Sequence, residues 1–160
     1  MNVLVNCLYG ADAVDEARVQ ALAAFAMGRL DLPEGSEVSL SFVDDDEMAQ
    51  MNEGYRGKEG PTDVLSFECD NLEDGFPEGE GAQGYLLGDI VIAPDVAARQ
   101  AAEYGHGFLE EVDLLVVHGV LHLCGYDHID DEEAREMEAL QDAIVAAWAA
   151  HWAKEAASGC

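Results

Sequence analysis

One segment, residues 108–123, constrains the fold more than any other part of the chain. It is apolar on nearly all sides and ends in the run Leu-Leu-Val-Val-His-Gly-Val-Leu-His-Leu. A helix that is apolar all round has no face suited to water, so it is expected to be a buried central helix. We therefore predict that the other elements of the fold pack around it.

This helix carries two histidines, and a third follows it. His118 and His122 are four residues apart, so they share one helix face. Gly125 can end the helix and fold the chain back, which would bring His128 toward the other two. One such histidine alone would be interpreted as a core residue, but three imidazoles are costly to bury unless something satisfies their nitrogens. Three nitrogen ligands suit zinc best, with one position left open for water, so the sequence predicts one Zn²⁺ per chain.

The spacing also matches the H-E-x-x-H-x-x-G-x-x-H ligand pattern of metzincin peptidases. The glutamate that acts as general base in those enzymes would stand at position 119, which is Gly119 here. The metal geometry is therefore expected without the peptidase chemistry. Asp127 either orients a ligand imidazole or the water, or is a turn residue. Cys124 is interpreted as a small buried hydrophobe rather than a ligand.

Hydrophobic periodicity and turn residues predict an α+β fold with one mixed four-stranded sheet and several helices. At 160 residues the chain is expected to form a single domain, 1–160, with a frayed tail at 155–160. A loop is expected over 70–84. Strands are predicted at 3–8, 38–43, 64–67 and 85–92, and helices at 12–30, 44–52, 95–104, 108–123 and 132–154.

The charge balance restricts the partners. The chain has 34 acidic residues against 7 Lys and Arg, a net charge of −27. Such a charge argues against generic binding to nucleic acid, whose backbone it repels. The N-terminus shows no signal peptide, and no segment has the length of a membrane span, so a cytoplasmic protein without membrane contact is expected.

Two of the few cations fall close together. Arg56 and Lys58 lie where a predicted helix runs into a predicted strand. In so acidic a chain they favour a local anion site, although paired loop cations are ordinarily only solvated. The planar fork of arginine suits a phosphate. A zinc-activated water beside a phosphate-binding arginine is typical of a phosphodiesterase. Arg56 would stabilise the negative charge that increases on the phosphate oxygens during the reaction.

The motifs resemble those of a known family. Residues 118–128 resemble the H-G-x-L-H-L-x-G-Y-D-H signature of the YbeY endoribonucleases, which act as rRNA maturation factors. Residues 52–58 followed by 61–67 look like a second signature, and 87–92 look like a third. Gln100-Ala101, Glu103 and Gly105-His106 also fit the pattern. Two departures are Gly107, where a serine is usual, and Glu59, where an aspartate is usual.

The resemblance implies a zinc-dependent, single-strand-specific endoribonuclease that acts in 16S rRNA 3′-end maturation and ribosome quality control. It implies His118, His122 and His128 as metal ligands and Arg56 as a cleft residue important for activity. Lys58 is expected to bind substrate beside Arg56. His106 has no assigned role, and we interpret it and His151 as structural or solvent-facing.

A non-catalytic alternative remains open. Zinc would then brace the fold, and the protein would act as an assembly factor on the small ribosomal subunit. The net charge favours this alternative, because basic ribosomal proteins would attract a chain that bare RNA repels.

Overall fold

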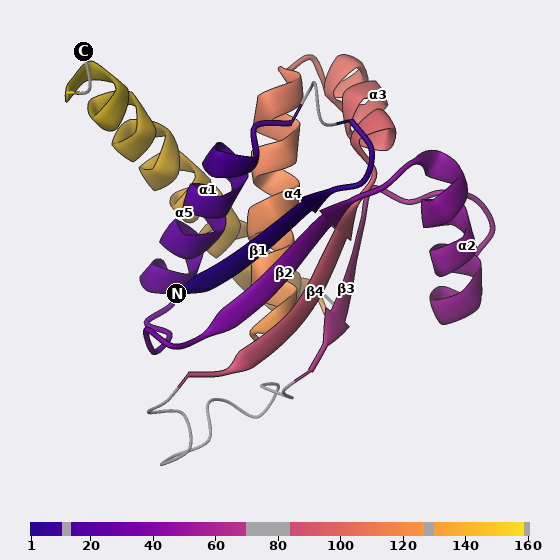
Figure 1. Cartoon of the computed structure of the whole chain (residues 1–160), viewed down its shortest axis with the longest axis horizontal. Helices are drawn as coiled ribbons and strands as arrows, with labels where there is room; N and C mark the ends of the chain where they lie inside the picture. Colours follow the sequence, from indigo (N-terminus) through magenta and orange to yellow (C-terminus); the bar gives the residue numbers. More distant parts are fainter. Residues whose placement is uncertain (11–13, 70–83, 127–129, 159–160) are drawn as a thin grey trace.

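The computed structural model describes residues 1–10, 14–69, 84–126 and 130–158 (Figure 1). These residues form four strands and five helices. In chain order they are β1 (Asn2–Cys7), α1 (Glu16–Arg29), β2 (Glu37–Phe42), α2 (Asp45–Arg56), β3 (Val64–Glu68), β4 (Leu86–Ile92), α3 (Pro94–Tyr104), α4 (Phe108–Leu123) and α5 (Asp131–Ser158).

The four strands form one mixed sheet in the order β1-β2-β4-β3. β1, β2 and β4 run parallel, and β3 pairs antiparallel to β4, with Ser66 opposite Ile90. β3 is therefore an edge strand whose outer side carries unpaired backbone groups. This arrangement confirms the predicted α+β fold with one mixed four-stranded sheet.

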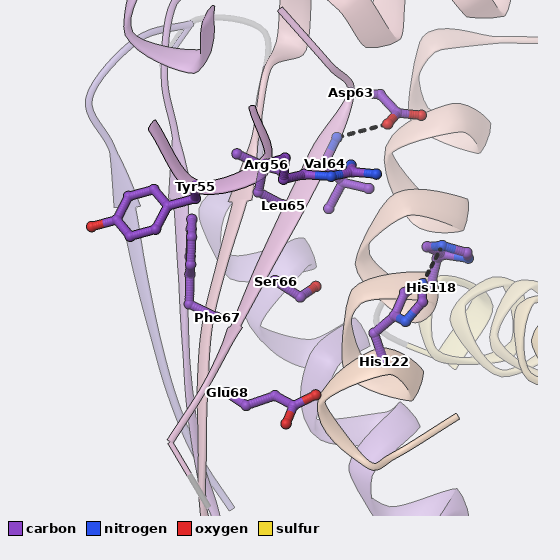
Figure 2. Close-up of a pocket in the computed structure, with 10 residues that line it drawn as sticks. All are labelled: Tyr55, Arg56, Asp63, Val64, Leu65, Ser66, Phe67, Glu68, His118 and His122. Carbon is purple, nitrogen blue, oxygen red and sulfur yellow. Dashed lines mark hydrogen bonds between the residues drawn. The ribbon is translucent and has the colours of Figure 1, made fainter. Parts of the chain in front are cut away.

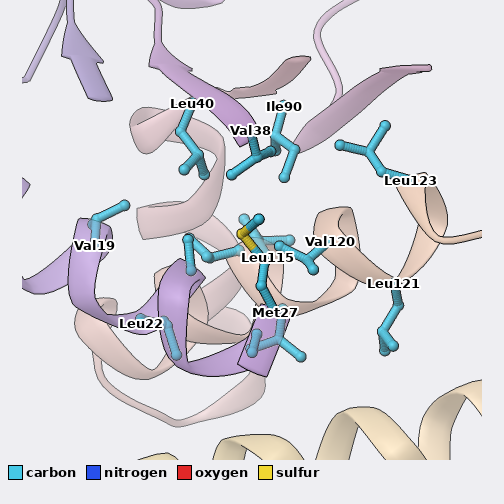
Figure 3. Packing of buried hydrophobic residues seen from close by; sticks show 14 of the residues in the cluster. Val19, Leu22, Met27, Val38, Leu40, Ile90, Leu115, Val120, Leu121 and Leu123 are labelled. Carbon is cyan, nitrogen blue, oxygen red and sulfur yellow. The ribbon is translucent and has the colours of Figure 1, made fainter. Parts of the chain in front are cut away.

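Helix α4 is the centre of the molecule. Figure 1 shows α1, α4 and α5 on one face of the sheet, with α4 behind its middle. α4 packs against α1, α3, α5, β3 and β4, and its Val116, Val117, Val120 and Leu121 are fully buried. Figure 3 shows α4 side chains packed among those of the sheet and α1. The buried central helix and its bounds are as predicted.

Helix α2 covers the other face of the sheet near β3. Its Met48 is fully buried in a small cluster with Leu65 of β3 and Val91 of β4. Ile90, the neighbour of Val91, points to the large cluster beneath α4, because successive strand residues face opposite sides. The edge strand β3 is thus held between α2 and α4.

Three helix ends differ from the sequence-based prediction by more than one residue. α1 begins at Glu16 rather than at 12, because Asp15 is its N-cap and accepts a hydrogen bond from the Arg18 amide. α2 continues past the predicted end at 52 to Arg56 and ends on Gly57, which adopts the left-handed conformation (φ 66°). α5 runs to Ser158, so residues 155–158, expected in a frayed tail, are helical.

The loop expected at 70–84 lies outside the described residues except for Gly84. None of the described helices combines the length and the apolar character needed to cross a membrane.

At Gly119, α4 packs closely on the sheet. A Cβ atom at this position would lie 2.8 Å from Cγ2 and 3.0 Å from Cδ1 of Ile90, closer than packed carbon atoms approach. Ile90 is itself fully buried. The absence of a side chain at Gly119 therefore sets how near the two histidines on either side of it come to the sheet.

We expect Gly119→Ala to lower the free energy of unfolding by about 1–3 kcal/mol, because the added methyl group must displace Ile90 or the helix. Gly28→Ala is the matched control, since a Cβ at that α1 position meets nothing within 4 Å. It should leave stability unchanged or raise it by up to about 1 kcal/mol, the difference in helix propensity. Urea unfolding of both variants checks this, and equal effects would contradict the close approach.

Candidate active site

A cleft of about 710 Å³ lies along the edge strand β3. Side chains from α2, β3 and α4 line it, together with Asp63, which precedes β3 (Figure 2). They are Tyr55, Arg56, Asp63, Val64, Leu65, Ser66, Phe67, Glu68, His118 and His122. The structure thus brings Arg56 to the same cleft as two of the three predicted metal ligands.

His118 and His122 point toward each other across one turn of α4. Their Nε2 atoms are 3.0 Å apart, and the two rings meet nearly edge-on, with an interplanar angle of 78°. Two nitrogens that each lie about 2.0–2.1 Å from one zinc ion in tetrahedral geometry would be roughly 3.3–3.4 Å apart. The two imidazoles therefore fit a shared zinc ion with a small adjustment.

The third predicted ligand, His128, and its neighbour Asp127 lie outside the described residues. Within the part of the chain that the structure describes, no group of three His, Cys, Asp or Glu side chains forms a metal site. The three-histidine ligand set therefore stays a prediction.

Gln141 of α5 forms a hydrogen bond with the ring nitrogen of His118 that points away from His122. Its Oε1 lies 2.7 Å from Nδ1 of His118. An amide oxygen only accepts hydrogen bonds, so this contact places the proton of a neutral His118 on Nδ1 and leaves Nε2 as the nitrogen with a lone pair. A metal ligand needs that tautomer, and partners of this kind also set the ring orientation.

The sequence reasoning missed Gln141, although a signal existed. Gln141 interrupts the apolar stripe of α5 formed by Met137, Ile144 and Trp148, all of them buried. A polar side chain within such a stripe needs a buried partner. Sequence alone does not say that this partner is a histidine on another helix.

Arg56 enters the cleft from the end of α2. Figure 2 shows its guanidinium extending past the start of β3 toward the side of the strand that faces His118. Among the described residues no carboxylate forms an ion pair with Arg56, whereas Arg18 pairs with Asp113 and Arg99 with Asp45. In a chain of net charge −27, an arginine without an ion pair is suited to an anionic ligand.

Lys58 lies beyond the helix end and is exposed, but it does not line the cleft. The buried side chain of Asn52 holds this segment, since its Nδ2 donates to the Gly60 carbonyl at 2.8 Å. The Lys58 amide also approaches the Asn52 carbonyl, at 3.4 Å. Asn52 was not predicted as a functional residue, and it positions the turn that follows Arg56.

A chain of polar side chains connects Asp63 of the cleft to His106. Asp63 Oδ1 accepts from the Val64 amide at 2.8 Å. With its amide nitrogen toward the two carboxylates, Gln100 donates to Asp63 at 3.1 Å and to Glu111 at 3.0 Å. Glu111 is buried and lies 2.5 Å from Nε2 of His106. His106 is half-buried and contacts Glu111. Of the two interpretations made from the sequence, structural or solvent-facing, this contact agrees with the structural one.

Gly107, where the resembling family has a serine, is the N-cap residue of α4 and gives no side-chain hydrogen bond to the helix. A serine hydroxyl at an N-cap accepts from the first free amides of a helix. The departure at Gly107 thus concerns the start of α4 and does not reach the cleft. His151 is exposed on α5 and stacks on Phe25 at 5.2 Å.

Two observations concern the alternatives raised by the sequence, a glutamate at position 119 and a ligand role for Cys124. The close approach of Gly119 to Ile90 leaves no room for the glutamate that a peptidase of the metzincin pattern would carry there. Cys124 is buried, and burial raises the pKa of its thiol to about 12, so it remains a neutral thiol near pH 7. Both agree with the interpretations made from the sequence.

Comparison with known proteins places these features in a family. The sequence profile of the family described as "Endoribonuclease YbeY" matches residues 10–149. Proteins named Endoribonuclease YbeY are 47% identical in a Nocardioides species and 48% identical in Salinispora tropica. The alignments cover 86% and 87% of this chain and 91% and 90% of those proteins.

Among solved structures, the solution structure of TM1509 from Thermotoga maritima is similar, with a TM-score of 0.65 and 25% identity over 96% of this chain and 93% of that one. The chain therefore belongs to the YbeY endoribonuclease family, which confirms both the family and the class of enzyme predicted from the sequence.

Proposed function

We propose that this protein is a zinc-dependent endoribonuclease that cuts single-stranded RNA, with one zinc ion held by His118, His122 and His128. The observation that carries the proposal is the pair of Nε2 atoms, 3.0 Å apart, in a cleft that also contains Arg56. Family membership supports RNA as the substrate.

The residues of the cleft have different roles in the proposed reaction. A zinc ion at the histidine nitrogens would supply Lewis acidity and lower the pKa of the attacking water. Gln141 keeps His118 in the tautomer that leaves Nε2 able to bind metal. Arg56 donates to the non-bridging phosphate oxygens and stabilises the negative charge that increases on them as water attacks.

We further propose that the substrate is the 3′ region of 16S rRNA in the cytoplasm, with a role in ribosome quality control. The net charge of −27 supports a second candidate role, in which the protein also docks on basic proteins of the small ribosomal subunit. In the extreme form of this second role, zinc only braces the fold and no RNA is cut.

The central experiment measures metal content and cleavage together. We expect wild-type protein to carry one zinc per chain and to cleave a labelled single-stranded RNA, and His122→Ala to lose both, because two remaining ligands bind zinc poorly. Elemental analysis and gel-based cleavage measure the two quantities. His151→Ala, a histidine exposed on α5, is the control and should keep both.

A wild-type protein without metal would refute the zinc proposal. Metal without cleavage would favour the assembly-factor role instead.

Arg56 is tested separately from the metal. We expect Arg56→Ala to reduce the cleavage rate about 100- to 1,000-fold, the usual cost of removing a donor to a charged transition state, with zinc content unchanged. Arg56→Lys should recover only part of the rate, because an ammonium cannot make the two directed bonds of the guanidinium. Arg135→Ala, exposed on α5, is the matched control. Unchanged cleavage by Arg56→Ala would refute the assigned role.

Gln141 is expected to set metal affinity rather than to bind metal. Gln141→Leu should weaken zinc binding about 10- to 100-fold, as removal of such a supporting hydrogen bond does elsewhere. Competition with a chromophoric chelator measures the affinity, and a thermal unfolding curve checks that the variant folds. The control is Gln50→Leu on the exposed side of α2. Equal affinities in both variants would show that the His118 contact does not act on the metal site.

A further inference from the structure

The cleft has an aromatic rim that the chemistry above does not use. Tyr55 lies on the last turn of α2, beside Arg56, and is 74% exposed although its side chain is large and mostly apolar. Its ring meets that of Phe67 at 4.8 Å with an interplanar angle of 65°. This edge contact holds the Tyr55 ring in place while most of the residue stays open to solvent.

The position of this ring relative to the histidines is defined by β3. Figure 2 shows Tyr55 and Phe67 on one side of the strand, and His118 and His122 on the other, with the Arg56 guanidinium on the histidine side. All five residues line the same cleft. An extended ligand that leaves the histidines across the free edge of β3 therefore passes Arg56 and then meets the Tyr55 ring.

The charge of the protein limits how such a ligand can be held. Few cations are available, and the 34 acidic residues repel a phosphate backbone. Stacking of a base on an aromatic ring does not depend on net charge and contributes substantially to the binding of single strands. Within the described part of the chain Arg56 forms no ion pair, and an exposed ring beside such a cation is one arrangement by which proteins bind single-stranded nucleic acid.

We propose that Tyr55, backed by Phe67, stacks on a nucleobase of the bound strand beyond the phosphate that is cut, on the far side of β3 from the histidines, and that this contact contributes to the preference for single strands. The inference rests on the proposed function, because it assigns a binding role within the same cleft. A paired base inside a duplex has both faces covered by its neighbours, so it cannot stack on the ring without first being unstacked.

The experiment compares Michaelis constants for cleavage of a labelled single-stranded RNA by zinc-loaded full-length variants. Tyr55→Ala should raise KM about 10-fold or more while kcat changes less than about 2-fold, because stacking acts in binding. Tyr55→Phe should behave like wild type because it keeps the ring. Tyr104→Ala is the matched control, since Tyr104 is 66% exposed at the end of α3 and does not line the cleft.

Two further measurements separate stacking from packing. Tyr55→Leu retains an apolar cover over Phe67 but has no ring, so its KM should rise as that of Tyr55→Ala does. In a series of RNAs that each carry one abasic nucleotide at a different distance from the cut, one position should raise KM for wild type with little further effect in Tyr55→Ala, because the base and the ring form one contact. Thermal unfolding of each variant monitors the fold.

The outcomes distinguish this inference from the proposed function. If wild type cleaves RNA and Tyr55→Ala has the same KM, or Tyr55→Leu retains the wild-type KM, the stacking role is wrong and the endoribonuclease proposal stands. Equal abasic penalties in wild type and Tyr55→Ala at every position would likewise overturn it. If wild type neither binds nor cuts RNA, both proposals fail together.

Discussion

The contact between Gly119 of α4 and Ile90 of β4 is the constraint on which the rest of the structure depends. It lets a helix that is apolar on nearly all sides pack its backbone at Gly119 directly on the Ile90 side chain of the sheet. The histidines on either side of this region face the edge strand β3 and the cleft beside it. The same contact excludes a glutamate at position 119, the general base of metzincin peptidases. One packing requirement therefore determines how near the histidines lie to the sheet and also leaves α4 without that base.

The second constraint is electrostatic. With 34 acidic residues, the chain engages several of its arginines within the fold, as the bidentate contact of Arg18 with Asp113 shows. Arg56 differs because α2 carries it to the cleft, Gly57 ends the helix there, and Asn52 holds the following turn. These three local features fix the position of the Arg56 guanidinium. An anionic ligand is therefore attracted to this one place, although the net charge of the protein repels it.

Much of the fold could be predicted from sequence because periodicity is a local property. The bounds of α4 followed from its mostly apolar sequence, and the sharing of a helix face by His118 and His122 followed from their spacing. The predicted end of α2 was wrong. Asn52 and Gly54 are residue types that often end helices, but here the helix ends at Gly57, which adopts the left-handed conformation. Gln141 was missed because its contact with His118 arises from packing of α5 on α4, which no local pattern encodes.

The edge of β3 connects these constraints. An unpaired strand edge invites association with other chains. This edge strand is short and lines the cleft, with Ser66 and Glu68 on its histidine side (Figure 2). α2 and α4 flank it, so what approaches the edge also meets groups from both helices. The Nε2 atoms come from α4, and the guanidinium and the exposed ring come from α2. Because the two helices pack on opposite faces of the sheet, a ligand that contacts both sets must cross the strand edge, and this requirement is the geometric basis of the single-strand preference proposed above.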